Sequence, residues 1–252
     1  MFSLLKPARL LDDATADALH NTFEWALEQF DKVYFFQSTR LIHPTRDDFP
    51  DKANNAEDMA RALCARICEY AGLSHWPFTV QAPQQFSGQI PPLLGLDTHS
   101  RQQETAQPTG SQPGLEISYA NEMMRKPMDL VGSMSKNIAQ HFLHQSQLIP
   151  PAGPESFDAT AEVIATMMGF GLFIANSAYT FRGSCARCYD PRANRAAALS
   201  EDEAIYTLAL FCHYKNIPNK DVTPSLKSYL RGAFKKARKQ VARRLPAAAS
   251  NE

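Results

Sequence analysis

The sequence predicts a predominantly helical α+β protein, and three observations support this prediction. Apolar residues recur at spacings of three and four through most of the chain, which is typical of helices with one buried face. Short runs rich in β-branched and aromatic residues lie before residue 121. These runs do not alternate with regular helices, so a doubly wound parallel sheet is disfavoured and a short antiparallel sheet is expected.

Two helices are expected in the N-terminal part of the chain. The first covers residues 13–30, whose apolar residues form one stripe. The second covers residues 56–71. Asn55 stands at its N-cap, and Gly72 stands where a left-handed residue ends many helices.

The strands are expected around a long irregular loop. Residues 33–42 begin with Val-Tyr-Phe-Phe and predict a short strand, and residues 78–81 predict another. Residues 82–114 are rich in Gln, Pro, Gly, Ser and Thr, which bury too little apolar surface to offset ordering. A third strand is expected at 115–120.

Helices dominate the rest of the chain. Residues 127–143 and 156–178 predict two core helices, the second largely apolar. The capping box of Ser200 and Glu203 opens a third helix. Thr223 and the proline after it predict the start of a basic C-terminal helix.

The whole chain, 1–252, is interpreted as a single domain in three parts. These are an N-terminal helix and strand part at 1–81, the Gln- and Pro-rich loop at 82–114, and a helical core at 115–252. The loop is a candidate for binding a partner as well as a passive linker.

Composition limits the class of protein. The 26 basic residues equal the 26 acidic ones, so any attraction to nucleic acid or membrane must be local. No apolar run reaches the roughly 18 residues that span a bilayer, and the first residues lack a signal-peptide core. Five cysteines fit reduced thiols, so a cytoplasmic protein is expected.

Two segments of the chain carry a resemblance to a known group. They read GFGLFIANSA at residues 169–178 and LSEDEAIYTLALF at residues 199–211. They are similar to a group of uncharacterised bacterial proteins whose fold is zincin-like, the fold of HExxH metallopeptidases. The resemblance covers roughly residues 115–215. It implies an HExxH helix before the GFG helix, and a pair of zincin-like core helices.

The HExxH motif is degenerate in this chain. Two His residues four apart on a helix face one Zn²⁺, and the Glu between them acts on the bound water. The resemblance places Lys136 and Gln140 at the two His positions and Asn137 at the Glu position. An ammonium group has no lone pair, and an amide is no general base. Glu162 would be the acid on the following helix.

This substitution pattern predicts that Lys136 replaces the charge of the metal and pairs with Glu162. The other interpretation is that Lys136, Asn137 and Gln140 form an ordinary polar face. A displaced zinc site is a third interpretation, with His141 and His144 on one helix face and Glu162 or His213 as a further ligand.

The cysteines do not form a clear metal motif. Cys185 and Cys188 form one CxxC pair, and a second CxxC is absent from the sequence. Cys64 and Cys68 are most simply small core residues. A four-thiolate site that joins these two pairs, and redox activity of the CxxC pair, are weaker interpretations.

The C-terminal helix concentrates positive charge. Its basic residues form an exposed face opposite an apolar stripe, which is either a solvated face or a surface for an anionic partner. An acidic protein is favoured over nucleic acid as that partner, because stacking aromatic residues are scarce. The basic residues are Lys227, Arg231, Lys235, Lys236, Arg238, Lys239, Arg243 and Arg244.

Together these features predict a non-catalytic, zincin-like scaffold, a pseudo-metallopeptidase that binds an unidentified protein and needs no cofactor. An active zinc-dependent hydrolase with displaced ligands is the alternative, and nucleic-acid binding through the basic helix is the third candidate. A phosphate-binding glycine loop and a GxSxG nucleophile motif are both absent from the sequence.

Overall fold

The computed structural model describes residues 9–86, 88, 90, 91, 93, 101, 114–178 and 195–245. The elements in chain order are α1 (Asp13–Gln29), α2 (Lys32–Gln37), α3 (Ala56–Ala71), β1 (Phe78–Gln81), β2 (Leu115–Ser118), η1 (Asn121–Arg125), α4 (Pro127–Ser146), η2 (Pro154–Ser156), α5 (Phe157–Ala165), η3 (Thr166–Phe170), α6 (Gly171–Ser177), α7 (Glu201–Tyr214), α8 (Asn219–Val222), η4 (Thr223–Ser225) and α9 (Leu230–Arg244). The predominantly helical α+β class is therefore confirmed.

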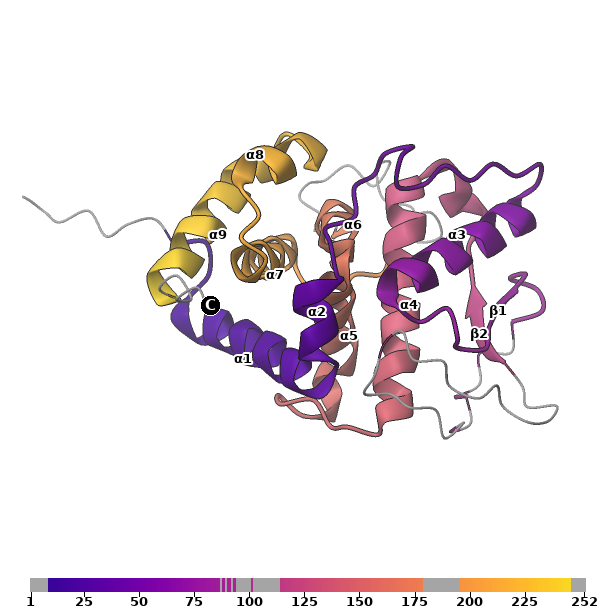
Figure 1. Cartoon of the computed structure of the whole chain (residues 1–252), viewed down its shortest axis with the longest axis horizontal. Coiled ribbons are helices and arrows are strands. Elements are labelled where there is room, and N and C mark those ends of the chain that lie inside the picture. Colours follow the sequence, from indigo (N-terminus) through magenta and orange to yellow (C-terminus); the bar gives the residue numbers. More distant parts are fainter. Residues whose placement is uncertain are drawn as a thin grey trace, which may run out of the picture.

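Helices α4, α5 and α6 form the centre of the molecule. Helix α4 packs against α5 and α6, with α3 and the strands on one side (Figure 1). On the other side α7 packs against α6, α1 and α9. One continuous hydrophobic cluster joins buried residues from all of these helices and from β2. The polar residues of α4 and α5 therefore lie close to the core of the protein.

The two N-terminal helices follow the sequence prediction. Asp12 caps α1 by accepting a hydrogen bond from the backbone N–H of Thr15, and Asn55 caps α3 in the same way through Asp58. Gly72 ends α3 with φ at 73°, the left-handed conformation that glycine adopts at least cost.

The strand predicted at residues 33–42 is wrong, because its first residues form helix α2. The Asp31 carboxylate accepts a hydrogen bond from Tyr34 N and so caps a helix start. At the other end, Lys215 Nζ donates to the carbonyl oxygens of Phe35 and Phe36. Contacts at both ends thus favour a helix despite the strand-like composition.

The predicted antiparallel arrangement of the sheet is also wrong. Strands β1 and β2 form a two-stranded parallel sheet, with Phe78 opposite Leu115 and Gln81 opposite Ser118. A parallel pair requires a crossover connection of about a dozen residues or more. The 33 residues at 82–114 exceed this length, so the connection is long enough for the parallel pairing.

The second core helix is broken rather than continuous. A π-helical turn, η3, separates α5 from α6, and Gly169 within it has φ at 105°. A Cβ atom at this position would collide with the carbonyl oxygen of Arg40, and the Gly169 carbonyl accepts a hydrogen bond from Ile42 N at 3.0 Å. Glycine at 169 therefore allows the segment before α3 to pack directly on the helix.

The same stretch, Pro154–Ser177, is long and apolar enough by composition to cross a membrane. The protein itself buries 83% of its most apolar 18-residue window. This burial is typical of a core helix.

The C-terminal helices agree with the sequence in part. The capping box of Ser200 and Glu203 opens α7 as predicted. The last helix does not begin at Thr223, because that residue starts the short η4 turn. Helix α9 begins at Leu230.

Candidate functional site

A cluster of polar side chains lies between α4 and α5, where the resemblance places the metal site. We call Lys136, Gln140, Asp158, Glu162 and Arg195 the interhelical cluster. Its first two members lie one turn apart on α4, and the two acids lie one turn apart on α5. Because α4 and α5 pack side by side, the two pairs face each other.

The side chains of α4 make polar contacts to both acids. The amide of Gln140 donates to Asp158 Oδ1 at 2.7 Å. Lys136 Nζ lies 3.6 Å from Asp158 Oδ2 and 3.7 Å from Glu162 Oε1. It also donates to the carbonyl oxygen of Ala196 at 3.3 Å. Lys136 is 8% exposed, so its charge is largely enclosed by these partners.

The Glu162 carboxylate is completely buried and is held by donors of the protein. Oε1 accepts hydrogen bonds from Arg195 Nη1 and from Ala198 N at 2.8 Å, and Oε2 accepts one from Leu199 N at 3.1 Å. Burial of a carboxylate is tolerated when it is paired and hydrogen-bonded, as here. Glu162 therefore anchors residues 195–199 against α5.

Arg195 is equally enclosed and positions this anchor. It is 2% exposed, and its Nε donates to Ser177 Oγ at 2.7 Å. Its Nη2 donates to the carbonyl oxygen of Ile174 at 3.1 Å, and its backbone N–H donates to Asp129 Oδ1 at 3.0 Å. The planar guanidinium thus links α5 and α6 to the segment before α7, and the backbone N–H of the same residue links this segment to α4.

The predicted contact between Lys136 and Glu162 is present, but two members of the cluster were not predicted. Asp158 precedes Glu162 by four residues, so helical spacing was a signal that could have found it. Arg195 lies in an irregular segment, where no periodic pattern relates it to Glu162. In this geometry Asp158 contacts both Lys136 and Gln140, whereas Glu162 contacts only Lys136 of these two residues.

A pocket of about 470 Å³ opens beside the interhelical cluster. Asn137 and Gln140 of α4 both line it. The pocket combines amide and imidazole groups with apolar side chains, a composition typical of binding sites. The complete lining is Phe86, Ile90, Pro91, Glu116, Asn137, Gln140, His141, His144 and Phe157.

The displaced zinc site is not assembled from its predicted ligands. His141 Nε2 lies 2.9 Å from the carbonyl oxygen of Glu116, and His144 Nε2 lies 3.0 Å from that of Pro91. A carbonyl oxygen only accepts, so both Nε2 atoms carry protons and donate. Burial lowers the pKa of His141, which favours the neutral ring.

In the described part of the chain, no group of three or more His, Cys, Asp or Glu side chains could hold a metal ion. His141, His144, Glu162 and His213 therefore do not converge. Cys185 and Cys188 lie outside the described residues, and so does any site that they share with Cys64 and Cys68. These two cysteines and Cys212 are free thiols.

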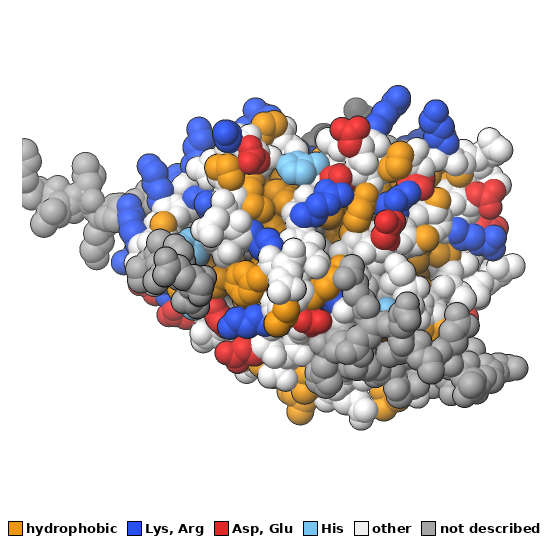
Figure 2. All heavy atoms as spheres, in the orientation of Figure 1, with side chains coloured by type: hydrophobic (Ala, Val, Ile, Leu, Met, Phe, Trp, Pro, Cys, Tyr) orange, Lys and Arg blue, Asp and Glu red, His pale blue; other side chains and the backbone are white. Residues whose placement is uncertain are grey.

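The basic residues of the C-terminal region divide into two sets. Three arginines bond to other groups of the protein. Arg231 donates to the carbonyl oxygen of Leu226, and Arg238 donates to Asn219 and to backbone carbonyls. Arg244 forms ion pairs with Asp13 and Asp17. Lys and Arg side chains line the α9 edge of the molecule in Figure 2. The exposed basic residues of α9 are Lys235, Lys236, Lys239 and Arg243, and also Arg231, although it bonds to the Leu226 carbonyl. An anionic partner would therefore meet fewer charges than the sequence suggests.

No family model, curated protein or solved structure matches this chain.

Proposed function

We propose that this protein is a non-catalytic, zincin-like scaffold that acts in the cytoplasm by binding another protein. In this proposal the interhelical cluster replaces a zinc site. It keeps α4, α5 and the segment before α7 together without a metal ion.

The occupancy of the Glu162 carboxylate is the observation that supports this proposal most directly. Three internal donors engage its two oxygens, and the Lys136 ammonium lies 3.7 Å from Oε1. A zinc ligand needs a free lone pair directed at the metal, and an adjacent cation repels a second one. Hydrolysis further needs a general base, and position 137 is an amide.

The pocket beside the cluster is the proposed docking site for the partner. In this proposal it takes the place of the substrate site of a zincin-like peptidase, and its lining combines Phe86, Ile90 and Phe157 with the amides of Asn137 and Gln140. Phe86 and Ile90 are 42% and 83% exposed, so they offer apolar surface at the mouth of the pocket. A polypeptide segment with one apolar side chain fits this combination.

Restoring the motif tests the position of the lost metal site. We expect the triple variant Lys136→His, Asn137→Glu, Gln140→His to bind about one additional equivalent of zinc by elemental analysis. Asp158 would supply the third ligand, because it contacts residues 136 and 140. Adding Asp158→Ala to the triple variant should abolish the gain. An unchanged zinc content in the folded triple variant would contradict the proposed register of α4.

The native protein provides the test between scaffold and enzyme. The hydrolase would be favoured over the scaffold if the native protein holds one tightly bound equivalent of zinc and has peptidase activity, and if Glu162→Gln removes both. Retention of the fold with no hydrolysis after zinc is supplied would support the scaffold.

Docking in the pocket is tested with peptides selected against the native protein from a random display library. Asn137→Trp should fill the pocket and abolish binding. Ser133→Trp lies one turn away on α4 and lines a different pocket, so it should leave binding intact. Equal binding to both folded variants would contradict the pocket as the docking site.

A further inference from the structure

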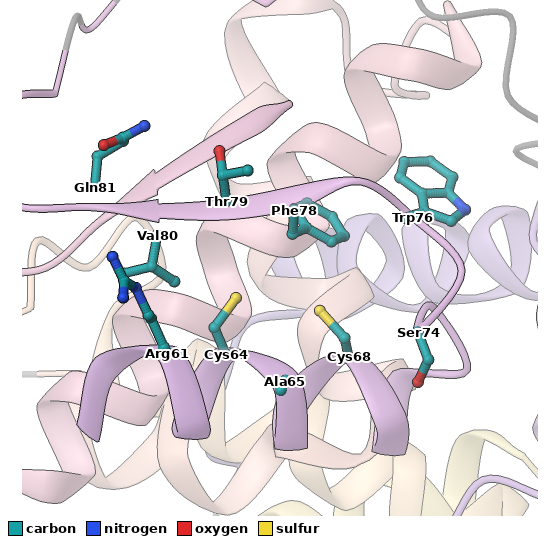
Figure 3. Close-up of a pocket in the computed structure, with 10 residues that line it drawn as sticks. All are labelled: Arg61, Cys64, Ala65, Cys68, Ser74, Trp76, Phe78, Thr79, Val80 and Gln81. Atoms are coloured by element: carbon teal, nitrogen blue, oxygen red, sulfur yellow. The ribbon is translucent and has the colours of Figure 1, made fainter. Parts of the chain in front are cut away.

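A second pocket, of about 580 Å³, lies between α3 and β1 and contains two thiols (Figure 3). Cys64 and Cys68 are four residues apart on α3, so they share one helix face. Both sulfur atoms point from α3 toward β1, on the side of Thr79 and Phe78 (Figure 3). The two thiols therefore form a pair that faces a cavity rather than close-packed core.

The two thiols interact with each other. A hydrogen bond from Cys68 lowers the pKa of Cys64, while the same contact and burial raise the pKa of Cys68. Cys64 and Cys68 are 3% and 5% exposed, so little water competes for their sulfur atoms. Thiolate sulfur is the form that binds metal ions.

The geometry of the pair disfavours a disulfide. A disulfide holds its Cβ atoms about 3.5–4.5 Å apart, whereas side chains four apart on a helix have Cβ atoms about 5–6 Å apart. Closing the bond would distort α3. An ion between two sulfur atoms accepts the wider spacing.

The surroundings favour an ion that needs two ligands. Structural zinc takes four ligands, and within the described residues no third His, Cys, Asp or Glu joins the two cysteines. Soft ions such as Cu(I) prefer thiolates and accept two of them in a linear arrangement. Arg61 also lines the pocket, and its guanidinium pairs with Glu57.

We propose that Cys64 and Cys68 form a binding site for one soft, thiophilic metal ion held by two sulfur atoms. Binding replaces the two thiol protons, which leave to solvent. A monovalent ion such as Cu(I) or Ag(I) leaves the site with one negative charge, and a divalent ion such as Hg(II) leaves it neutral. No electron transfer is involved.

Ag(I), which is not redox-active under these conditions, is the probe for the test. The titration uses the full chain with Cys185→Ser and Cys188→Ser, so that the CxxC pair cannot compete. We expect one equivalent to bind. Adding Cys64→Ser or Cys68→Ser should weaken binding at least about 100-fold, since losing even an outer-shell partner of a metal site costs 10–100-fold.

Cys212→Ser is the matched control. Cys212 is a buried, free thiol on α7, and burial raises its pKa to about 12. Its replacement should leave Ag(I) binding unchanged. If the folded Cys64→Ser and Cys68→Ser proteins bind as tightly as their parent, or if Cys212→Ser loses binding, the proposal is overturned. Circular dichroism checks the fold of each variant.

X-ray absorption of the parent loaded with one equivalent of Cu(I) tests the site without altering it. Two sulfur neighbours around copper are expected, and a shell of nitrogen or oxygen neighbours would overturn the proposal. Zn(II) should bind far more weakly than Ag(I), whereas equal affinity would indicate a different ligand set.

Discussion

At the scale of single residues, the ion pair of Glu162 and Arg195 is the contact on which the cluster depends. Both side chains are almost fully buried, and both make further hydrogen bonds to the backbone. Removing one partner leaves the other charge buried without compensation. We therefore expect Glu162→Gln to lower the free energy of unfolding by about 3–5 kcal/mol. Urea denaturation followed by circular dichroism measures it.

Glu57→Gln is the control for this prediction. Glu57 pairs with Arg61 on the surface of α3, where their side chains are 43% and 58% exposed. Water screens such pairs, so the loss should stay below about 1 kcal/mol. Equal effects of the two substitutions would show that burial does not set the strength of the Glu162 pair.

His141 makes stability depend on pH. Burial lowers its pKa below the ordinary value of 6.5. Below pH 6.5 the unfolded chain then binds more protons than the folded one. The contribution of the neutral His141 ring to the free energy of unfolding is therefore present above pH 6.5 and is lost as the pH falls below it. The loss amounts to about 1.4 kcal/mol for each unit of pKa difference.

His141→Gln should therefore reduce the fall in unfolding free energy between pH 7.5 and 5.5, measured in urea. An amide can still donate to the Glu116 carbonyl but does not titrate. Identical pH profiles for the two proteins would mean that His141 titrates equally in the folded and unfolded states.

At the scale of elements, Gly169 allows the break between α5 and α6. Gly169→Ala would place a methyl group against the Arg40 carbonyl in a backbone conformation that L-residues rarely adopt. We expect it to destabilise the protein by more than about 1 kcal/mol in thermal or urea unfolding. Gly232→Ala is the control. A Cβ there meets no atom within 4 Å in helix α9, so it should stabilise by about 1 kcal/mol. A neutral Gly169→Ala would show that the break does not need glycine.

The elements also show how far local sequence signals reach. Caps and periodicity predicted α1, α3 and the start of α7, because those signals act within a few residues. They failed for α2, whose six residues are too few for periodicity to decide. The break at Gly169 depends on a backbone packed from residues 40–42, which periodicity does not encode.

At the scale of the whole molecule, one hydrophobic cluster joins the two sides of α4. The two tryptophans of the chain report on opposite sides: Trp25 lies in α1 and Trp76 precedes β1. Each of the variants Trp25→Phe and Trp76→Phe keeps one tryptophan. In each variant we expect the urea midpoint from tryptophan fluorescence to coincide with the midpoint from circular dichroism. Separate midpoints would divide the chain into two independently unfolding units.

Long-range arrangement was the least predictable part of the fold and of the site. The parallel pairing of β1 with β2, and the approach of Arg195 to Glu162, join residues more than 30 positions apart. Neither follows from propensity or spacing. The contact of Lys136 with Glu162 was predictable because the resemblance placed these two opposite charges on neighbouring helices.

The internal neutralisation of Glu162 has a consequence for how the chain matures. A metalloprotein that gains folding energy from its ion becomes less stable whenever free ion is scarce, by the law of mass action. Here the counter-charge is encoded in the polypeptide and arrives with every newly made molecule. The charge of Glu162 is therefore balanced as soon as Arg195 packs against it.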